Sequence, residues 1–376
     1  MDIRDKILSK VNKIVVKIGT RVLTNEDGFL DINQIMELSR QIIRLRSKGY
    51  SVVVVSSGAV GAGIKTLGWD KRPNILPVLQ AAAAVGQGKL IEIYNGCFKK
   101  QGYHAAQLLL TRQDFEDRQR YLNTCNTLHS LLNLKTVPII NENDTISVEE
   151  IAFGDNDILS ALVTNLLRAE LLILLSSIDG LYKTPPTSGK QSNILPTVDI
   201  ISDDIKKLAF KIKTKEGIGG MESKLEAASI ATSSGEAVII ANGRQSDVLL
   251  KIMDFDNVGT LFIPHKKKVT SRKRWIGFSV RSNGIIYIDD GALVALQKKG
   301  KSLLPSGVVR VDGNFIKGDV VSVVNVNRNK EIAKGLVNYS VEEVQKIKGL
   351  RTSLIRKTLG SKPYDEIIHR DNLFLL

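Results

Sequence analysis

Two patterns of hydrophobic and polar positions divide this chain. Up to about residue 262, short runs of Val, Ile and Leu alternate with longer stretches whose apolar residues recur at helical spacing. Because the short runs are apolar at successive positions, helices should cover both faces of the sheet they form. The first part is therefore predicted to be an α/β domain, an open, mostly parallel sheet sandwiched by helices. The predicted strands are 14–18, 52–55, 105–110, 137–140, 171–175 and 237–241, and the predicted helices are 32–47, 79–100, 118–132, 157–168 and 221–233.

The pattern changes after a basic stretch, HKKKVTSRKR, at residues 265–274. Beyond it, short apolar segments are separated by Gly, Asn and Asp, which favour turns. These segments predict a small all-β, barrel-like module at residues 275–360, joined by the basic linker to a first domain at 1–264. The predicted strands are WIGFSV (275–280), GIIYI (284–288), SGVVRV (306–311), DVVSVV (319–324) and EIAKGLVNY (331–339).

Charge separates the two parts as well. The chain has a formal net charge of +14, and residues 266–376 hold 22 Lys and Arg against 10 Asp and Glu. The chemistry of the first domain therefore does not explain the basicity. A basic module attracts phosphate groups, so weak RNA binding is one hypothesis for it. A solvated basic face is the alternative, because its few aromatic residues form no base-stacking array.

Several classes of protein are disfavoured by composition. The two cysteines, Cys97 and Cys125, are too few and too far apart for a disulfide framework or a cysteine-based zinc site. The first 13 residues lack the apolar run of a signal peptide, and no apolar run reaches the roughly 20 residues that span a bilayer. We expect a cytoplasmic protein without membrane association and without a metal site built from protein side chains alone.

Candidate ligand-binding residues follow the first two predicted strands. In open α/β sheets, ligands bind at the carboxyl ends of strands. Lys17 would reach a phosphate chain there, and Gly19 would let the backbone approach it, although a surface lysine beside a turn glycine is the alternative. The second strand leads into SSGAVGAG, where backbone amides of Ser57, Gly58 and Ala59 would bind an anion at a helix N-terminus. This segment does not fit the Walker pattern, and a glycine-rich packing turn is its alternative.

Acidic residues follow the fourth strand. INENDT (140–145) places Asp144 where it could receive the ammonium group of an amino acid, or where it could belong to a structural turn. GDNDILSA (154–161) opens a helix in which Asp155 and Asp157 flank Asn156. Asp157 could hold two lysines in register if a second lysine converges on it.

Lys224 is a candidate for that second lysine. It lies at the start of a helix that follows a glycine-rich loop at 216–220, which could wrap a nucleotide phosphate. Ser176 and Ser177 end the fifth strand, where they could contact the nucleotide. Phosphoryl transfer requires positive charge over the transferred group and a fixed acceptor more than covalent chemistry from the protein. These residues therefore indicate an ATP-dependent kinase of a small amino acid.

Taken together, the motifs resemble the amino-acid kinase family. They are VVKIGT, VVSSGAVGAG, AAVGQ, LLLTRQDFEDRQRYLN, PIINENDT, GDNDILSA, GGMESK and GTLF, and the C-terminal KSLLPSG and GNFIKGD are similar to a PUA module. The resemblance implies ATP and Mg²⁺ as cofactors and phosphorylation of the γ-carboxylate of L-glutamate, the first step of proline biosynthesis. It also implies a homo-oligomer and feedback inhibition by proline.

The resemblance also implies roles for single residues. Lys17 and Lys224 would stabilise the transferring phosphoryl group, and Asp157, supported by Asp155, would hold these lysines. The substrate would contact Ser57, Gly58, Ala59, Asp144 and Asn156. ATP would contact Lys17, Gly19, Ser176, Ser177, Ile218, Gly219, Gly220, Met221, Glu222, Ser223 and Lys224. One departure is Ser176-Ser177, where family members commonly have Thr-Asp, so that serine hydroxyls replace a carboxylate.

Two other functions stay open at the level of sequence. One is a kinase of the same fold that acts on acetylglutamate, aspartate or a nucleoside monophosphate. The INENDT and GDNDILSA pair and the PUA-like tail argue against it. The other is an RNA-binding PUA protein whose kinase-like half is inactive or secondary.

Overall fold

The computed structural model describes residues 2–25, 27–146, 156–183, 194–210, 220–265 and 270–376. They form two compact units, and each unit is described by itself. The first comprises Met1–Asp114 and Gln119–Lys268, and the second comprises Phe115–Arg118 and Val269–Leu376. None of the described helices has both the length and the apolar character needed to cross a membrane.

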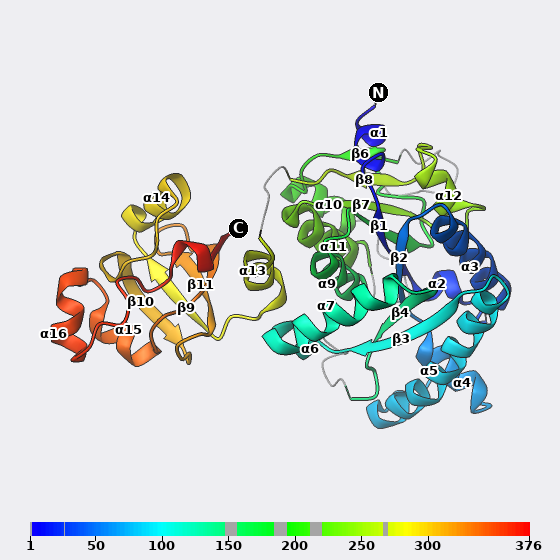
Figure 1. The fold of residues 1–376 in the computed structure, drawn as a ribbon, viewed down its shortest axis with the longest axis horizontal. Coiled ribbons are helices and arrows are strands. Elements are labelled where there is room, and N and C mark those ends of the chain that lie inside the picture. Colours follow the sequence, from blue (N-terminus) through cyan, green and yellow to red (C-terminus); the bar gives the residue numbers. More distant parts are fainter. Residues whose placement is uncertain (1, 26, 147–155, 184–193, 211–219, 266–269) are drawn as a thin grey trace. The chain divides into compact units, whose positions relative to one another are not determined.

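An eight-stranded sheet forms the centre of the first unit (Figure 1). Its strand order is β3-β4-β2-β1-β5-β7-β8-β6, and every pairing is parallel except that of β7 with β8. The mostly parallel α/β sheet predicted from the apolar runs is thus confirmed. The strands are β1 (Lys13–Ile18), β2 (Ser51–Ser56), β3 (His104–Leu110), β4 (Thr136–Glu142), β5 (Leu171–Ser176), β6 (Thr197–Val198), β7 (Ala237–Asn242) and β8 (Thr260–Phe262).

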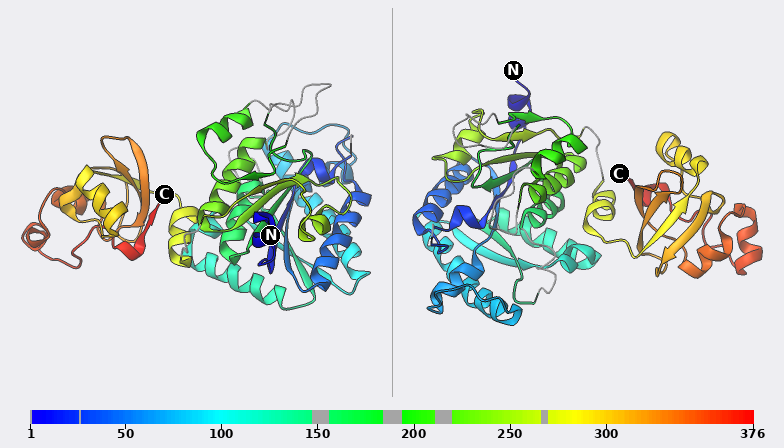
Figure 2. Two further views of the ribbon diagram at one scale, coloured as in Figure 1. Left: turned by 90° about the horizontal axis from the view of Figure 1, so that it is seen from above. Right: turned by 180° about the vertical axis from the view of Figure 1, so that it is seen from behind.

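Helices cover both faces of this sheet (Figure 2). They are α1 (Ile3–Leu8), α2 (Thr20–Leu23), α3 (Ile32–Ser47), α4 (Ala59–Thr66), α5 (Leu76–Lys99), α6 (Arg112–Glu116), α7 (Arg118–Leu132), α9 (Asn156–Leu167), α10 (Asp203–Phe210), α11 (Met221–Ser234) and α12 (Val248–Met253). The five helices predicted from periodicity are all present, and α3 and α7 have the predicted bounds. Helices α1, α2, α6, α10 and α12 and strands β6 and β8 were not predicted, because they are short or lack a strong period, whereas α4 is the helix expected to begin within SSGAVGAG.

Alternation along β1 determines where its lysine points. Ile14, Val16 and Ile18 belong to the core formed with α3, α5 and α12. Because successive side chains of a strand point to opposite faces, Lys17 lies on the other face, where α9 packs against β1 and α11 against α9. The strand therefore directs one cation toward the beginnings of two helices.

Helices α4 and α5 approach each other so closely that glycine is required at their crossing. A Cβ atom on Gly63 would lie 1.7 Å from the Ala82 carbonyl oxygen, and one on Gly86 would lie 1.8 Å from the Ala59 carbonyl oxygen. Gly58, at the turn before α4, has φ 99°, which glycine tolerates best. The glycines of SSGAVGAG are thus divided between helix packing at Gly63 and a left-handed turn at Gly58.

The second unit contains a five-stranded sheet with the order β10-β9-β11-β12-β13. Its core is formed by the inward residues of these strands together with α14 and α15. The strands are β9 (Gly284–Ile288), β10 (Val308–Gly313), β11 (Val320–Asn325), β12 (Lys330–Leu336) and β13 (Leu373–Leu375). The helices are α13 (Ser271–Arg274), α14 (Asp290–Lys299), α15 (Val341–Ile347) and α16 (Ile355–Leu359), with short helical turns η2 (Pro305–Gly307), η3 (Thr352–Leu354) and η4 (Arg370–Asn372).

Two details of this unit differ from the sequence prediction. The smaller β-sheet module is present, but it also contains α-helices that the turn-rich pattern did not indicate. The predicted strand at 275–280 is wrong, because Trp275–Ser279 forms a π-helix, η1. Four of its five residues are buried, so side chains do not alternate between core and solvent, and Gly277 packs directly on the Phe374 ring.

Substitution of two glycines on one helix tests the α4–α5 crossing. Gly86→Ala should lower the free energy of unfolding by about 1–3 kcal/mol, because the added methyl group meets backbone atoms. Gly88 on the same helix has no atom within 4 Å of its Cβ position. Gly88→Ala should therefore raise stability by about 0.5–1 kcal/mol through helix propensity. Urea denaturation measures both, and equal shifts in the two variants would contradict the close crossing.

Candidate active site

A cleft of about 740 Å³ opens at the carboxyl ends of β4, β2, β1 and β5. Parallel strands bring the residues that follow them to one edge of the sheet, which is where α/β proteins bind ligands. Most of the predicted site residues line this cleft. They are Lys17, Gly19, Ser57, Gly58, Ala59, Asp144, Asn156, Ser176, Ser177, Gly220, Met221 and Lys224.

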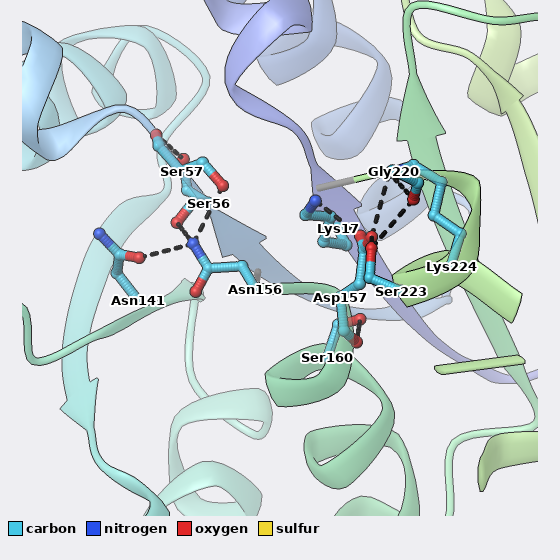
Figure 3. A network of polar contacts seen from close by, with 10 residues as sticks. All are labelled: Lys17, Ser56, Ser57, Asn141, Asn156, Asp157, Ser160, Gly220, Ser223 and Lys224. Carbon is cyan, nitrogen blue, oxygen red and sulfur yellow. Dashed lines mark hydrogen bonds and ion pairs between the residues drawn. The ribbon is translucent and has the colours of Figure 1, made fainter. Parts of the chain in front are cut away.

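Beside the cleft, two lysines share one buried carboxylate (Figure 3). Lys17 Nζ lies 2.6 Å from Asp157 Oδ1, and Lys224 Nζ lies 3.0 Å from Asp157 Oδ2. Ser223 Oγ donates to the same Oδ2 at 2.9 Å. Asp157 has no exposed surface, while Lys17 and Lys224 keep 2% and 5%. This is the convergence that the sequence predicts for these three side chains.

The convergence follows from three elements of the fold. Lys17 comes from the α9-facing side of β1, and Asp157 lies in the first turn of α9, where a carboxylate also interacts favourably with the helix dipole. Lys224 lies in the first turns of α11, which packs against α9. The three side chains carry one positive charge in excess, in a place that is shielded from water. A bound anion would compensate for that charge more strongly here than at an exposed site.

Asn156, next to Asp157, points to a different group of residues (Figure 3). Its Nδ2 donates to the Ser57 hydroxyl at 2.9 Å, to the Asn141 side-chain oxygen at 2.9 Å and to the Ser56 carbonyl at 3.1 Å. One amide therefore ties the end of β2 to the end of β4. The first turn of α9 supports two regions of the cleft, one through Asn156 and the other through Asp157.

Strand order arranges the lining groups along the sheet edge. The ends of β4, β2, β1 and β5 follow one another, so Asp144, Ser57, Lys17 and Ser176 succeed each other in that order. Adjacent strands are about 4.8 Å apart, so the row extends over roughly 14 Å. A carboxylate thus stands at one end, hydroxyl groups at the other, and the paired lysines between them.

Gly19 has a narrower role than the sequence indicates. It lines the cleft, but its N–H donates to the Leu175 carbonyl at 3.1 Å and continues the ladder between β1 and β5. Gly19 would therefore help a ligand to bind only through the space that its missing side chain leaves in the cleft. A Cβ atom there would come within 3.2 Å of the Leu175 carbonyl and 3.6 Å of Lys17 Nζ.

The other five predicted site residues fall into two groups. Asp155, Ile218 and Gly219 lie outside the described residues. Glu222 and Ser223 do not line the cleft, and the Ser223 hydroxyl instead donates to Asp157. Their contacts with ATP, like the role of Asp155, stay predictions.

Sequence reasoning missed two cations, Arg21 and Arg72, that line the cleft. Arg21 follows Gly19 closely and could have been suspected from that position. Arg72 lies in the connection between α4 and α5, which carries no motif. Arg244, after β7, was missed as well, although its guanidinium bonds the Arg21 and Thr24 carbonyls and so holds the rim of the cleft.

In the described part of the chain, His, Cys, Asp and Glu side chains do not gather in threes as a metal cage would require. Mg²⁺ commonly uses one or two carboxylates and takes its other ligands from substrate phosphates and water. Glu142 and Asp144 both line the cleft and have the oxygen chemistry that this ion prefers. The lining is therefore compatible with a metal that arrives with a nucleotide.

Comparison with known proteins places these features in a family context. Residues 12–242 match the model of the amino acid kinase family, and residues 284–359 match that of the PUA domain. The chain is 50% identical to a glutamate 5-kinase of Caldanaerobacter subterraneus subsp. tengcongensis, over 97% of this chain and 98% of that protein. It is 47% identical to the glutamate 5-kinase of Geobacter sulfurreducens, over 99% of this chain and 100% of the relative. Among solved structures, UMP kinase from Bacillus anthracis aligns with 67% of this chain and 96% of its own, at a TM-score of 0.47 and 12% identity.

Removal of the shared carboxylate should affect stability as well as activity. Asp157→Ala would leave two buried ammonium groups close together, so we expect the free energy of unfolding to fall by about 3–5 kcal/mol. The exposed pair of Lys48 and Asp254, at 3.1 Å, is the control. Asp254→Ala should cost no more than about 1 kcal/mol. Thermal and urea denaturation measure both, and a similar small loss in the two variants would contradict the central role of Asp157.

Proposed function

Because the chain belongs to the amino acid kinase family and, within it, to the glutamate 5-kinases, we propose that its cleft binds ATP and L-glutamate side by side. A γ-carboxylate oxygen of glutamate attacks the γ-phosphorus of ATP, and the bond from that phosphorus to the β,γ-bridging oxygen breaks. The products are γ-glutamyl phosphate and ADP, and the reaction is the first step of proline biosynthesis. The contact of Lys17 and Lys224 with one buried carboxylate beside the cleft is the observation that supports this proposal most directly.

The two lysines are proposed to stabilise the transferring phosphoryl group. Negative charge on that group is spread over its outer oxygens in the transition state, and fixed cations stabilise it better than mobile water does. Asp157 prevents the two ammonium groups from turning away from the cleft. Because it is fully buried, it holds them without extending toward the phosphates itself.

Glutamate is assigned to the part of the cleft at β2 and β4. Asp144 would pair with the substrate ammonium, and Ser57, Gly58, Ala59 and Asn156 would hold its carboxylates. The attacking γ-carboxylate is already ionised at neutral pH, so the reaction needs no general base. This explains why a kinase of this kind can work without a catalytic histidine.

ATP is assigned to the part of the cleft at β5 and α11. Gly19, Ser176, Ser177, Gly220 and Met221 line it there, next to the two lysines. Mg²⁺ would arrive with the nucleotide, with Glu142 as a protein ligand, and would neutralise phosphate charge when bound. Ser177 supplies a hydroxyl where relatives were expected to supply a carboxylate, so nucleotide contact there would be by hydrogen bonding alone.

We further propose that the enzyme acts in the cytoplasm as a homo-oligomer and that proline inhibits it. Proline shares the α-amino and α-carboxylate groups of glutamate, so it could use the contacts of Asp144 and Ser57. The second unit, with its excess of Lys and Arg, is proposed to bind RNA only weakly. RNA binding as the main function is not favoured, since the likeness to glutamate 5-kinases extends over nearly the whole chain.

A coupled assay of ADP release tests the proposed function. L-Glutamate should support turnover, whereas N-acetylglutamate, aspartate and UMP should support little. A preference for N-acetylglutamate or UMP would overturn the assignment of the substrate. ADP release without any preferred acceptor would overturn the kinase reaction itself.

The lysines can be tested in the same assay. Lys17→Ala and Lys224→Ala should each lower kcat by about 10²–10³-fold, the usual effect of removing one fixed donor to a developing charge. Each variant leaves Asp157 one lysine partner, so both should fold. Lys89, an exposed lysine bonded to Glu92 at 2.9 Å, provides the control, and Lys89→Ala should keep normal turnover. Near-normal turnover of Lys224→Ala would show that the two-lysine scheme is wrong.

Substitution of Asp144 should weaken the binding of glutamate, the acceptor, and leave the binding of ATP almost unchanged. Asp144→Ala removes the proposed partner of the substrate ammonium, so KM for glutamate should rise by roughly 10–100-fold, as for loss of a charged hydrogen bond. KM for ATP should change less than about twofold, since that contact lies elsewhere in the cleft. Steady-state kinetics with each substrate varied in turn decide between this result and an equal rise in both constants.

A further inference from the structure

Tyr94 does not line the cleft, but its hydroxyl is hydrogen-bonded to the end of β2, next to the proposed glutamate pocket. Tyr94 lies in α5, is fully buried, and has its hydroxyl 3.0 Å from the hydroxyl of Ser56. Ser56 is the last residue of β2 and is also fully buried. Val52 and Val54 pack into the core beside α5, and strand alternation puts Ser56 on the same face. The contact is therefore built into the packing of α5 on β2.

These hydroxyls form a chain with a definite direction. Ser56 Oγ donates to the Ser57 carbonyl at 3.2 Å. A serine hydroxyl has a single hydrogen, so Ser56 must accept the hydrogen bond from Tyr94. Burial raises the pKa of Tyr94 above its ordinary value, which keeps this donor protonated. The direction is thus from Tyr94 to Ser56 and from Ser56 to the Ser57 carbonyl.

Fixing the Ser57 carbonyl also fixes the Gly58 amide. In a trans peptide the C=O and the N–H point to opposite sides, and the described residues contain no cis peptide bond. With the Ser57 oxygen held toward Ser56, the Gly58 N–H faces the other way, and Gly58 lines the cleft. Within the described residues this N–H donates to no acceptor. This N–H is therefore available to donate a hydrogen bond to a ligand in the cleft.

We propose that Tyr94 is a positioning residue for the amino-acid substrate, acting through Ser56 on the Ser57–Gly58 peptide. This rests on the proposed function, in which Ser57 and Gly58 contact glutamate. Tyr94 touches no substrate. The φ of 99° at Gly58 leaves the peptide free to choose another orientation if its carbonyl is released, because glycine populates both signs of φ readily.

Kinetics of three variants test the chain of hydroxyls. Tyr94→Phe keeps the ring and removes only the donor, so KM for glutamate should rise roughly threefold to tenfold, the range for one ordinary hydrogen bond. KM for ATP should stay within about twofold. Ser56→Ala should have at least the same effect, and adding Tyr94→Phe to it should change nothing more, because the two act in series. Additive effects would overturn the relay.

A second buried tyrosine supplies the matched control. Tyr339, in the second unit, is also fully buried, and its hydroxyl donates to the Tyr364 carbonyl. Tyr339 does not line the cleft, and Tyr339→Phe removes the hydrogen bond that its hydroxyl donates to the Tyr364 carbonyl and the one that it accepts from the Tyr364 N–H at 3.2 Å. It should lower the melting temperature at least as much as Tyr94→Phe but leave both KM values unchanged. If it raised KM for glutamate as much as Tyr94→Phe, the effect would be general destabilisation and the positioning role would be wrong.

Amide hydrogen exchange gives a measurement that needs no substrate. In the unliganded full chain, the Ser57 amide, which is protected by its hydrogen bond to the Ile18 carbonyl at 3.3 Å, should exchange faster in Tyr94→Phe than in wild type, and should be unchanged in Tyr339→Phe. Unchanged exchange in Tyr94→Phe overturns the proposal whatever the kinetics show. If wild type failed to phosphorylate glutamate, the proposed function would fall, and exchange alone would then decide whether Tyr94 orients the peptide.

Discussion

The site depends on one electrostatic constraint, the sharing of the Asp157 carboxylate by two lysine ammonium groups. Two ammonium groups that contact the same carboxylate repel each other strongly when they are shielded from water. The carboxylate offsets that repulsion at 2.6 Å and 3.0 Å and fixes where both nitrogens lie. Without the carboxylate, this repulsion would push the two ammonium groups apart.

That constraint requires three separate elements to meet. The face of β1, the first turn of α9 and the first turns of α11 must come together within hydrogen-bonding distance. A parallel sheet achieves this because helices that connect parallel strands begin at the same edge at which those strands end. The same geometry places Asp144, Ser57, Lys17 and Ser176 along the cleft in the order of β4, β2, β1 and β5.

Contacts from α5 and α9 hold the turn after β2, at the other part of the cleft. The α4–α5 crossing at Gly63 and Gly86 brings α5 close to the turn after β2. Tyr94 on α5 can then reach Ser56, and Asn156 approaches Ser57 from the side of α9. The turn after β2 is thus held from two sides, by Tyr94 through Ser56 and by Asn156 through Ser57.

The sequence by itself determined the layered α/β sheet, the lysines and aspartate of the site, and the family. Those features are local: apolar runs, helical periods and short motifs express them within a few residues. Only the tertiary structure decided what depends on contacts between distant segments. The cleft position of Arg72, the use of the Gly19 N–H in the sheet and the link from Tyr94 to Ser56 leave no local pattern, because their partners are far away in the chain. The π-helix at Trp275–Ser279 was mistaken for a strand for the same reason, since close packing on Phe374 overrides its strand-like composition.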